Sequence, residues 1–163
     1  MIADLQVATF PISPSFSDSH WIPGKPGHQP DLRERSDELK TAKIIVIDDE
    51  ALIAETVVEI LGQEGFHAKA VSGGHSAIEL ARDWRPDIVL SDVIMPGLNG
   101  IETAIRIREF APLCRIILFS GQAATVDLLE KARQQGHRFD ILAKPIKPEQ
   151  LISVIRSSLG HVS

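Results

Sequence analysis

Residues 44–49 read IIVIDD, which is four β-branched apolar residues followed by two aspartates. An uninterrupted β-branched run of this length is typical of a strand buried on both faces, as in a parallel sheet covered by helices. In an open α/β sheet, ligands bind at the carboxyl ends of the strands. The stretch therefore predicts a central strand that carries Asp48 and Asp49 to a binding edge.

Three further apolar runs lead into polar residues suited to the same kind of site. The runs at residues 88–91, 116–119 and 141–143 are followed by Asp92, Ser120 and Lys144. If these strands are parallel neighbours, three carboxylates, a hydroxyl and an ammonium converge at one edge of the sheet. These groups suit a site for a divalent cation and a phosphoryl group.

From residue 44 onward, apolar runs alternate five times with amphipathic stretches. We expect strands at about 44–48, 66–71, 87–91, 115–119 and 139–143, and helices at about 50–64, 75–84, 101–110, 123–135 and 148–159. In the first helix, the spacing of Leu52, Val57, Ile60 and Leu61 predicts the buried face. Right-handed crossovers between parallel strands would fold this series into an α/β, doubly wound three-layer sandwich.

The composition changes near residue 40. Half of the chain's ten prolines fall within the first 30 residues, among Ser, Gly and His residues without periodicity. We therefore interpret residues 1–40 as a Pro-rich extension, mostly disordered, and residues 41–163 as one folded domain. The charged stretch 31–43 predicts a short, weak helix leading into that domain. Phe10, Phe16 and Trp21 are the extension's large apolar residues, so it is either a solvated tail or a segment that docks through Trp21 on this domain or on a partner.

Overall composition narrows the functional class. The net charge of −5 argues against a broad nucleic-acid surface, which needs a basic stripe. No apolar stretch approaches the roughly 20 residues that cross a bilayer, and the N-terminus does not resemble a signal peptide. We therefore expect a cytoplasmic protein. Cys114 is the single cysteine, which excludes an internal disulfide, and its apolar surroundings predict a buried structural thiol.

Asp48, Asp49 and Asp92 would form a cluster of like charges at the predicted sheet edge. Such a cluster is unfavourable unless a cation compensates it or a carboxylate takes up a proton. Mg²⁺ prefers a few carboxylates together with water and phosphate oxygens, so the cluster predicts a Mg²⁺ site. The alternative is that these aspartates only cap a helix or a loop.

Each of the polar residues at the predicted sheet edge lies within a short motif. These motifs are Ile47-Asp48-Asp49-Glu50, Ser91-Asp92 with Met95-Pro96-Gly97 and Asn99-Gly100, Phe119-Ser120-Gly121, and Ala143-Lys144-Pro145. Together they resemble the receiver domain of two-component response regulators over about residues 44–160. The resemblance implies a flavodoxin-like (βα)₅ fold with a parallel five-stranded sheet of order 2-1-3-4-5.

The resemblance also implies roles for the acidic residues. Asp92 would be the phosphoacceptor, taking a phosphoryl group from a sensor histidine kinase or a histidine phosphotransfer protein. Asp49 and Asp92 would ligate Mg²⁺ directly, Asp48 would act mainly through water, and the Ile94 carbonyl would complete the set. The domain would be a signalling domain that catalyses its own phosphorylation and dephosphorylation, not an enzyme in the usual sense.

The remaining implied roles concern the switch. Ser120 and Lys144 would bind the phosphoryl oxygens, and the Lys144–Pro145 peptide bond would be cis. Family members usually carry an aromatic residue three positions before the lysine, where this chain has Ile141. We therefore expect the switch that couples Ser120 to position 141 to be weaker or to be transmitted differently. Phe139, on the same predicted strand, is expected to be a core residue.

Two residues flank the expected path of the water that hydrolyses an acyl phosphate. They are Ile94, two positions after Asp92, and Gln122, two positions after Ser120. An apolar Ile94 cannot orient that water as an amide would. The sequence therefore predicts a long-lived acyl phosphate.

The stretch after the last predicted helix is too short for an output domain. We therefore expect signalling by protein contact, without DNA binding, through an unknown downstream target or through a phosphorylation-dependent homodimer; a relay of phosphate is a further option. By the resemblance, the first predicted helix would receive the kinase side, and the fourth helix, fifth strand and fifth helix would form the output face. The alternative function is a receiver-fold interaction module that signals without phosphorylation.

Two enzyme classes fit the sequence poorly. Haloacid-dehalogenase-like phosphatases place a second aspartate two residues after the nucleophile, where this chain has Ile94. A dinucleotide-binding module needs a Gly-rich turn after the first strand, but here that position carries three acidic residues that would repel a pyrophosphate.

Overall fold

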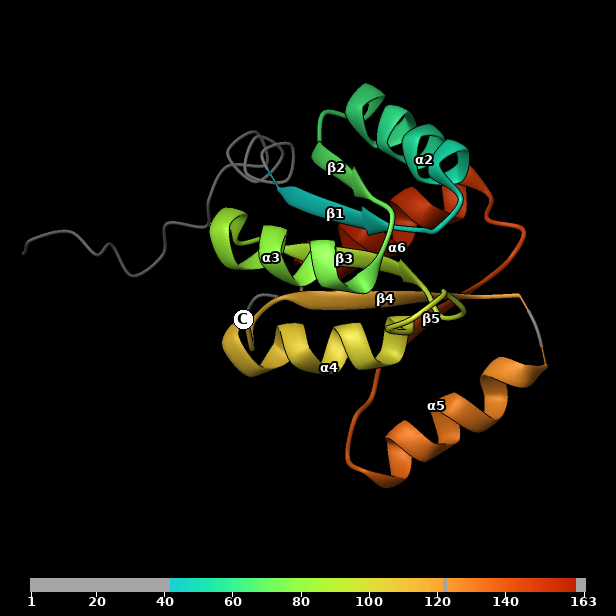
Figure 1. Ribbon diagram of the computed structural model, residues 1–163. Helices are drawn as coiled ribbons and strands as arrows, with labels where there is room; N and C mark the ends of the chain where they lie inside the picture. The colour runs from blue at the N-terminus through green and yellow to red at the C-terminus, as the bar shows by residue number, and fades with distance from the viewer. Residues whose placement is uncertain (1–41, 122, 161–163) are drawn as a thin grey trace, which may run out of the picture.

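The computed structural model describes residues 42–121 and 123–160 (Figure 1). Strands and helices alternate in the order β1 (Lys43–Ile47), α2 (Ala51–Gln63), β2 (His67–Val71), α3 (Gly74–Trp84), β3 (Ile88–Asp92), α4 (Gly100–Phe110), β4 (Arg115–Ser120), α5 (Ala124–Gln134), β5 (Asp140–Ala143) and α6 (Pro148–Gly160). The predicted alternation is confirmed, and each predicted boundary lies within one residue of the observed one. None of these helices is both long and apolar enough to span a membrane.

The five strands form one parallel sheet of order β2-β1-β3-β4-β5, which confirms the predicted fold. The register aligns the carboxyl ends of neighbouring strands: Ile47 pairs with Ser91, Asp92 with Phe119, and Ser120 with Ala143. The polar residues that end or follow these strands are therefore brought to a single edge.

The core consists of two apolar clusters, one on each face of the sheet. Alternate strand residues such as Ile44 and Val46 pack with α2 and α6, whereas Ile45 and Ile47 pack with α3, α4 and α5. All four of these strand side chains are at most 1% exposed. Burial of one such side chain contributes about 1.5–3 kcal/mol, so β1 is held firmly between the two layers.

The predicted buried face of the first helix is wrong at one residue. Ala54, Val57 and Leu61 are buried in α2, but the Leu52 side chain is 77% exposed. An α-helix turns 100° per residue, so Leu52, five residues before Val57, lies about 140° away from it around the helix axis. Leu52 therefore faces away from the core.

Two further predictions, for the helix at residues 31–43 and for Phe139, concern residues at or next to the ends of strands. Lys43 begins β1, so it does not end the short helix that was predicted for residues 31–43. Phe139 precedes β5; its partly buried ring packs against the α3–α4–α5 side of the core, next to His137 and under the Arg108 guanidinium. The predictions for the 1–40 extension, Trp21 and Gln122 lie outside the described residues.

Cys114 is buried, as predicted, and its thiol is expected to be unreactive in the folded protein. Burial, reinforced by the negative charge of Asp87, raises the pKa of Cys114 from 9.0 to about 12. Because the thiolate is the nucleophile, this shift lowers the reactive fraction near neutral pH about a thousandfold. Alkylation by iodoacetamide at pH 8, followed by intact mass, should be much slower in native buffer than in urea. Equal rates in the two solvents would contradict this.

Candidate functional site

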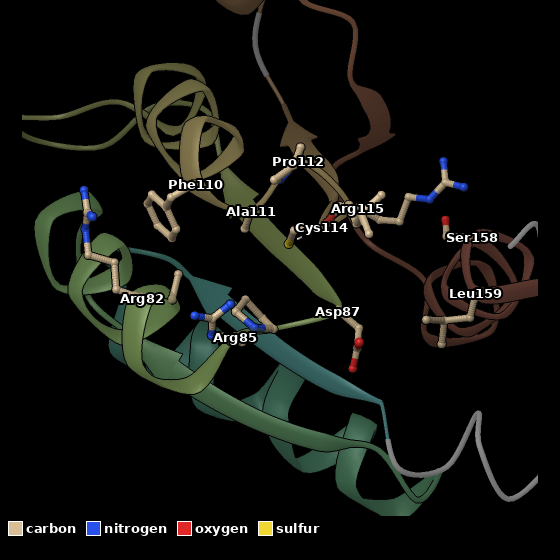
Figure 2. A pocket seen from close by; sticks show the side chains of 13 residues that line it. Arg82, Arg85, Asp87, Phe110, Ala111, Pro112, Cys114, Arg115, Ser158 and Leu159 are labelled. Carbon is tan, nitrogen blue, oxygen red and sulfur yellow. Dashed lines mark hydrogen bonds between the residues drawn. The ribbon is translucent and has the colours of Figure 1, made fainter.

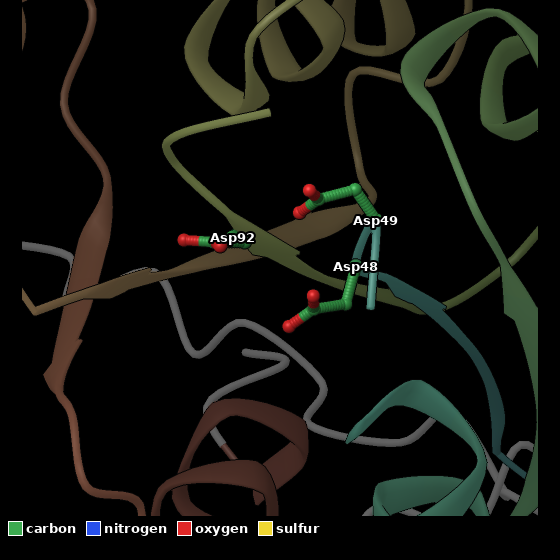
Figure 3. Close-up of side chains that lie close together, drawn as sticks. All are labelled: Asp48, Asp49 and Asp92. Atoms are coloured by element: carbon green, nitrogen blue, oxygen red, sulfur yellow. The ribbon is translucent and has the colours of Figure 1, made fainter. Parts of the chain in front are cut away.

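The carboxyl edge of the sheet gathers the three predicted aspartates. Asp48 and Asp49 directly follow β1, and Asp92 ends β3, its neighbour in the sheet. One carboxylate oxygen from each lies within 4.8 Å of the others (Figure 3). Asp48 is buried, Asp92 is partly buried and Asp49 is exposed. The cluster therefore opens to solvent on one side and is closed on the other.

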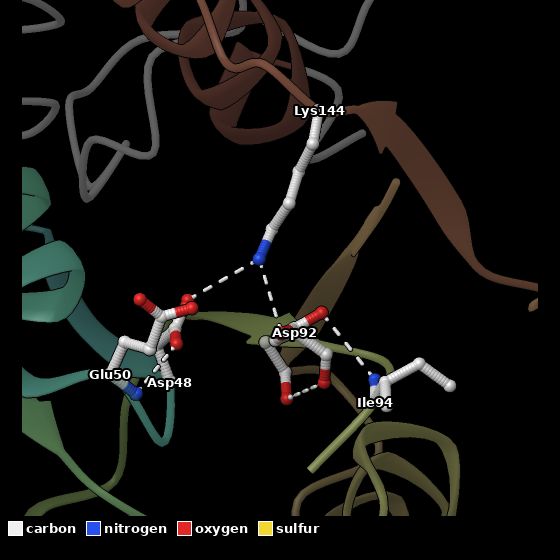
Figure 4. A network of polar contacts seen from close by, with 6 residues as sticks. Asp48, Glu50, Asp92, Ile94 and Lys144 are labelled. Carbon is white, nitrogen blue, oxygen red and sulfur yellow. Dashed lines mark hydrogen bonds and ion pairs between the residues drawn. The ribbon is translucent and has the colours of Figure 1, made fainter. Parts of the chain in front are cut away.

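Lys144 is the cation that faces this cluster. It follows β5, and its Nζ lies 3.1 Å from Asp92 Oδ2 and 3.5 Å from Asp48 Oδ2 (Figure 4). Its backbone N–H donates to the Ser120 carbonyl, and the Lys144–Pro145 peptide bond is cis, as expected. Burial lowers the pKa of Lys144, but the hydrogen bond and charge of Asp92, together with Asp48, outweigh burial and raise it overall. Lys144 therefore stays charged.

Only one of the two carboxylate oxygens of Asp48 accepts a hydrogen bond from the described residues. Its Oδ1 accepts a hydrogen bond from the Glu50 backbone N–H at 2.9 Å, at the start of α2. Its buried Oδ2 accepts no hydrogen bond from the described residues, and Lys144 Nζ, at 3.5 Å, makes only an ion pair that is longer than a good hydrogen bond. A local backbone hydrogen bond thus accounts for one oxygen, and the other remains available to a cation or to its water.

The donor chemistry of this edge fits Mg²⁺. Mg²⁺ takes hard oxygen ligands, usually one or two carboxylates with water and phosphate oxygens. Three carboxylates with an unsatisfied buried oxygen provide that set, whereas Lys144 neutralises only part of their charge. Ile94 is adjacent: its backbone N–H donates to Asp92 Oδ1 at 3.4 Å, and its side chain is 40% exposed.

Ser120 ends β4, where its hydroxyl forms a short hydrogen bond with the hydroxyl of Thr125. Thr125 lies in the first turn of α5 and is 1% exposed. Thr125 was not predicted from the sequence, because a single hydroxyl in a helical stretch carries no motif. The Ser120–Thr125 hydrogen bond links the end of β4 to α5, so a movement of Ser120 would be transmitted to that helix.

Ile141 occupies the position of the usual aromatic residue on β5, and its side chain is 48% exposed. It pairs in register with Leu118 and borders a shallow groove with Val126 and Phe139. The switch roles predicted for Ser120 and Ile141 concern two states of the molecule, so they stay predictions.

The loop after Asp92 is fixed tightly against the strand. The Gly100 N–H donates to the Val93 carbonyl at 3.0 Å, and Asn99 and Glu102 form a capping box at the start of α4. A Cβ atom at Gly100 would overlap the backbone carbonyl oxygen of Asp92. Only glycine therefore lets α4 begin this close to the site.

Gly100→Ala is accordingly expected to destabilise the fold and to displace Asp92. Because the obstacle is backbone, it cannot rotate away, and overpacking of this kind costs about 1–3 kcal/mol. Urea unfolding should show the loss. Gly62→Ala is the matched control, since a Cβ there meets nothing within 4 Å, and equal stability of the two variants would contradict the prediction.

The family model described as the response regulator receiver domain matches residues 44–156. Among curated proteins, the DNA-binding response regulator MtrA of Mycolicibacterium paratuberculosis is 32% identical over 117 residues, which is 72% of this chain and 51% of MtrA. The transcriptional regulatory protein PdtaR of Mycobacterium tuberculosis is 35% identical over 122 residues, which is 73% of this chain and 57% of PdtaR. The chain thus spans about half the length of these relatives.

Solved structures agree on the fold. A response regulator receiver domain protein from Clostridium thermocellum superposes with a TM-score of 0.67 at 26% identity, covering 73% of this chain and 94% of that one. The chemotaxis protein CheY4 of Vibrio cholerae superposes with a TM-score of 0.65 at 24% identity, covering 72% of this chain and 98% of that one.

Proposed function

Because the chain belongs to the response regulator receiver family, we propose that Asp92 accepts a phosphoryl group from a histidine kinase or a histidine phosphotransfer protein. The observation that carries the proposal is the position of Asp92, whose carboxylate lies 3.1 Å from Lys144 Nζ inside a cluster of three aspartates. A nucleophile, a fixed cation and a metal-binding acid set are the parts that phosphoryl transfer needs.

The proposed step is an in-line displacement. An Asp92 carboxylate oxygen attacks the donor phosphorus, the new P–O bond forms, and the bond to the donor's leaving group breaks with its electron pair. Lys144 stabilises the charge on the transferring oxygens from its position above Asp92. Asp49 and Asp92, with the Ile94 carbonyl and Asp48 through water, would hold Mg²⁺, which supplies further charge neutralisation when bound.

The phosphodonor partner is proposed to dock beside Lys144. A groove of about 370 Å³ lies between α2 and the β5–α6 connection, and its lining includes Leu52, Thr56, Lys144 and Pro145. Leu52 is 77% exposed there, and an apolar side chain so placed suits a protein partner. A donor histidine brought to this groove would lie next to the site.

The output is proposed to be protein–protein contact without DNA binding. Phosphorylation adds negative charge beside Ser120, whose hydroxyl is bonded to Thr125 on α5. A shift of Ser120 toward the phosphoryl group would break that bond and change the α5–β5 surface. The net charge of −5 supports a protein, rather than a nucleic acid, as the target.

A second candidate is an interaction module that signals without phosphorylation. The exposed Ile141 favours it, because the usual aromatic partner of Ser120 is missing. A Mg²⁺ titration of the full chain, followed by calorimetry, separates the two. The phosphoacceptor proposal predicts saturable binding that Asp49→Asn weakens strongly, whereas equal heats for both proteins would favour the module.

A long-lived acyl phosphate is expected from the side chain at position 94. Ile94 is partly exposed beside Asp92 and has no polar group to orient an attacking water. Ile94→Asn should accelerate dephosphorylation about tenfold, less than the roughly 10²–10⁴-fold of a general acid or base, because the amide only orients the water. Decay of the phosphorylated protein, followed by intact mass, measures the rate; Ile94→Leu is the matched control, and unchanged decay in Ile94→Asn would refute the idea.

A further inference from the structure

Another groove lies at the amino edge of the sheet, at the end opposite to Asp92. We call it the amino-edge groove; its volume is about 660 Å³ (Figure 2). The end of α3, the α3–β3 connection, the α4–β4 connection and the last turn of α6 form its walls. No part of the proposed phosphorylation function uses it.

The lining of the amino-edge groove is largely apolar and carries a net positive charge. Ala81, Phe110 and Leu159 provide apolar surface, and Leu113 on its rim is 93% exposed. The charged lining residues are three arginines and one aspartate: Arg82, Arg85, Arg115 and Asp87. Asp87 Oδ2 accepts the Lys43 backbone N–H at 2.7 Å, and the Arg82 guanidinium lies 4.4 Å from the centroid of the Phe110 ring. Three arginines against one aspartate leave the lining with a net positive charge. The groove therefore suits an apolar segment that carries a negative charge.

Arg85 gives a second indication that this groove has a use. It caps α3 with φ at +51°, and it is the one non-glycine with positive φ among residues 42–121 and 123–160. Glycine or asparagine is the usual residue at such a helix end, because a Cβ is unfavourable there. The unfavourable backbone conformation of Arg85 is explained if the arginine side chain has a function in the groove that it lines.

A segment of the same chain has the matching composition. Residues 10–22 read FPISPSFSDSHWI, with two phenylalanines, a tryptophan and two isoleucines, and Asp18 is their single acidic or basic residue apart from His20. The connection is long enough, since the 20 residues from Ile22 to Ala42 span up to about 70 Å. It also starts at the right place: Lys43, next to Ala42, donates its backbone N–H to Asp87 on the groove wall.

We propose that residues 10–22 dock in the amino-edge groove of their own chain, with Trp21 and its apolar neighbours on the lining and Asp18 beside the arginines. The contact covers Leu113 and leaves the Asp92 edge and the α2 groove open. It is therefore independent of phosphorylation.

Tryptophan fluorescence of the full, unphosphorylated chain tests the proposal. The chain has two tryptophans, so Trp84→Phe leaves Trp21 as the single reporter. Its emission should be blue-shifted, and protected from acrylamide, relative to the same protein in denaturant. Arg85→Glu and Leu113→Asp, introduced one at a time, should lower the docking constant about tenfold or more, as loss of a central contact does. Arg106→Glu, an exposed arginine outside the groove, is the matched control and should change nothing.

Two further variants separate docking from a structural effect. Asp18→Arg should weaken protection of Trp21, and its combination with Arg85→Glu should restore it. Arg85→Gly should keep or raise the melting temperature while it weakens protection, because glycine relieves the backbone but removes the charge. A purely structural role for Arg85 would instead change stability and leave Trp21 unaffected.

Three outcomes would overturn the proposal. They are solvent-like Trp21 emission in the native chain, protection that survives both groove variants, and protection that rises with protein concentration. The last would indicate a second copy as the occupant. None of them bears on Asp92, so the phosphorylation proposal would stand or fall separately.

Discussion

Asp92→Asn is expected to abolish phosphorylation by every donor. The amide has no carboxylate oxygen with which to form an acyl phosphate, and no other acidic side chain holds the same position. Asp48 Oδ2 is buried, and Asp49, although close enough to share a cation, lies exposed after a different strand. Phosphorus NMR of the chain with Mg²⁺ and acetyl phosphate should show an acyl phosphate signal in the native protein and none in the variant.

Two controls separate loss of the nucleophile from loss of charge or metal. Asp83→Asn removes an exposed carboxylate on α3 and should phosphorylate normally. Asp49→Asn keeps the nucleophile but removes one proposed metal ligand, so it should slow the reaction without abolishing it. A normal acyl phosphate signal in Asp92→Asn would refute the role proposed for Asp92.

Lys144→Ala is expected to have the next largest effect, a slowing of phosphorylation by about 10²–10³-fold. That is the usual loss when one fixed group that stabilises transition-state charge is removed. Lys144 is well placed for this role, since its Nζ lies 3.1 Å from the attacking carboxylate and its charge is secured by Asp92 and Asp48. Rates of mass gain with acetyl phosphate measure the effect.

Lys147→Ala is the matched control for Lys144. It removes an exposed lysine three residues away, outside the site, and should leave the rate unchanged. Lys144→Arg keeps the charge but changes the donor geometry and should retain part of the rate. If Lys144→Ala phosphorylates at the native rate while it remains folded, the charge-stabilising role is wrong.

The strands and most of the site were predictable because burial and chemistry leave strong local signals. The β-branched runs specified both the parallel sheet and the edge at which Asp48, Asp92 and Lys144 meet. The predicted proximity of the three aspartates is confirmed by the structure, whereas their roles in catalysis and metal binding stay proposals. Local patterns therefore predicted where the groups lie better than what each of them does.

Other features depend on contacts between distant parts of the chain. Thr125 meets Ser120 only because α5 begins beside the end of β4, and a lone threonine gives no sequence signal. Leu52 fits an apolar pattern but lies about 140° around the α2 axis from Val57, where it is exposed. The amino-edge groove is built from four separate segments, so no local pattern could have indicated it.

Phosphorylation of Asp92 is tested by the intact mass of the native chain after incubation with acetyl phosphate, either with Mg²⁺ or with a chelator in place of Mg²⁺. We expect the native chain to gain one phosphoryl group with Mg²⁺ and none with the chelator, Asp92→Asn to gain none, and the added group to map to Asp92. Equal gain by Asp92→Asn, or a phosphoryl group mapped to another residue, would contradict this expectation.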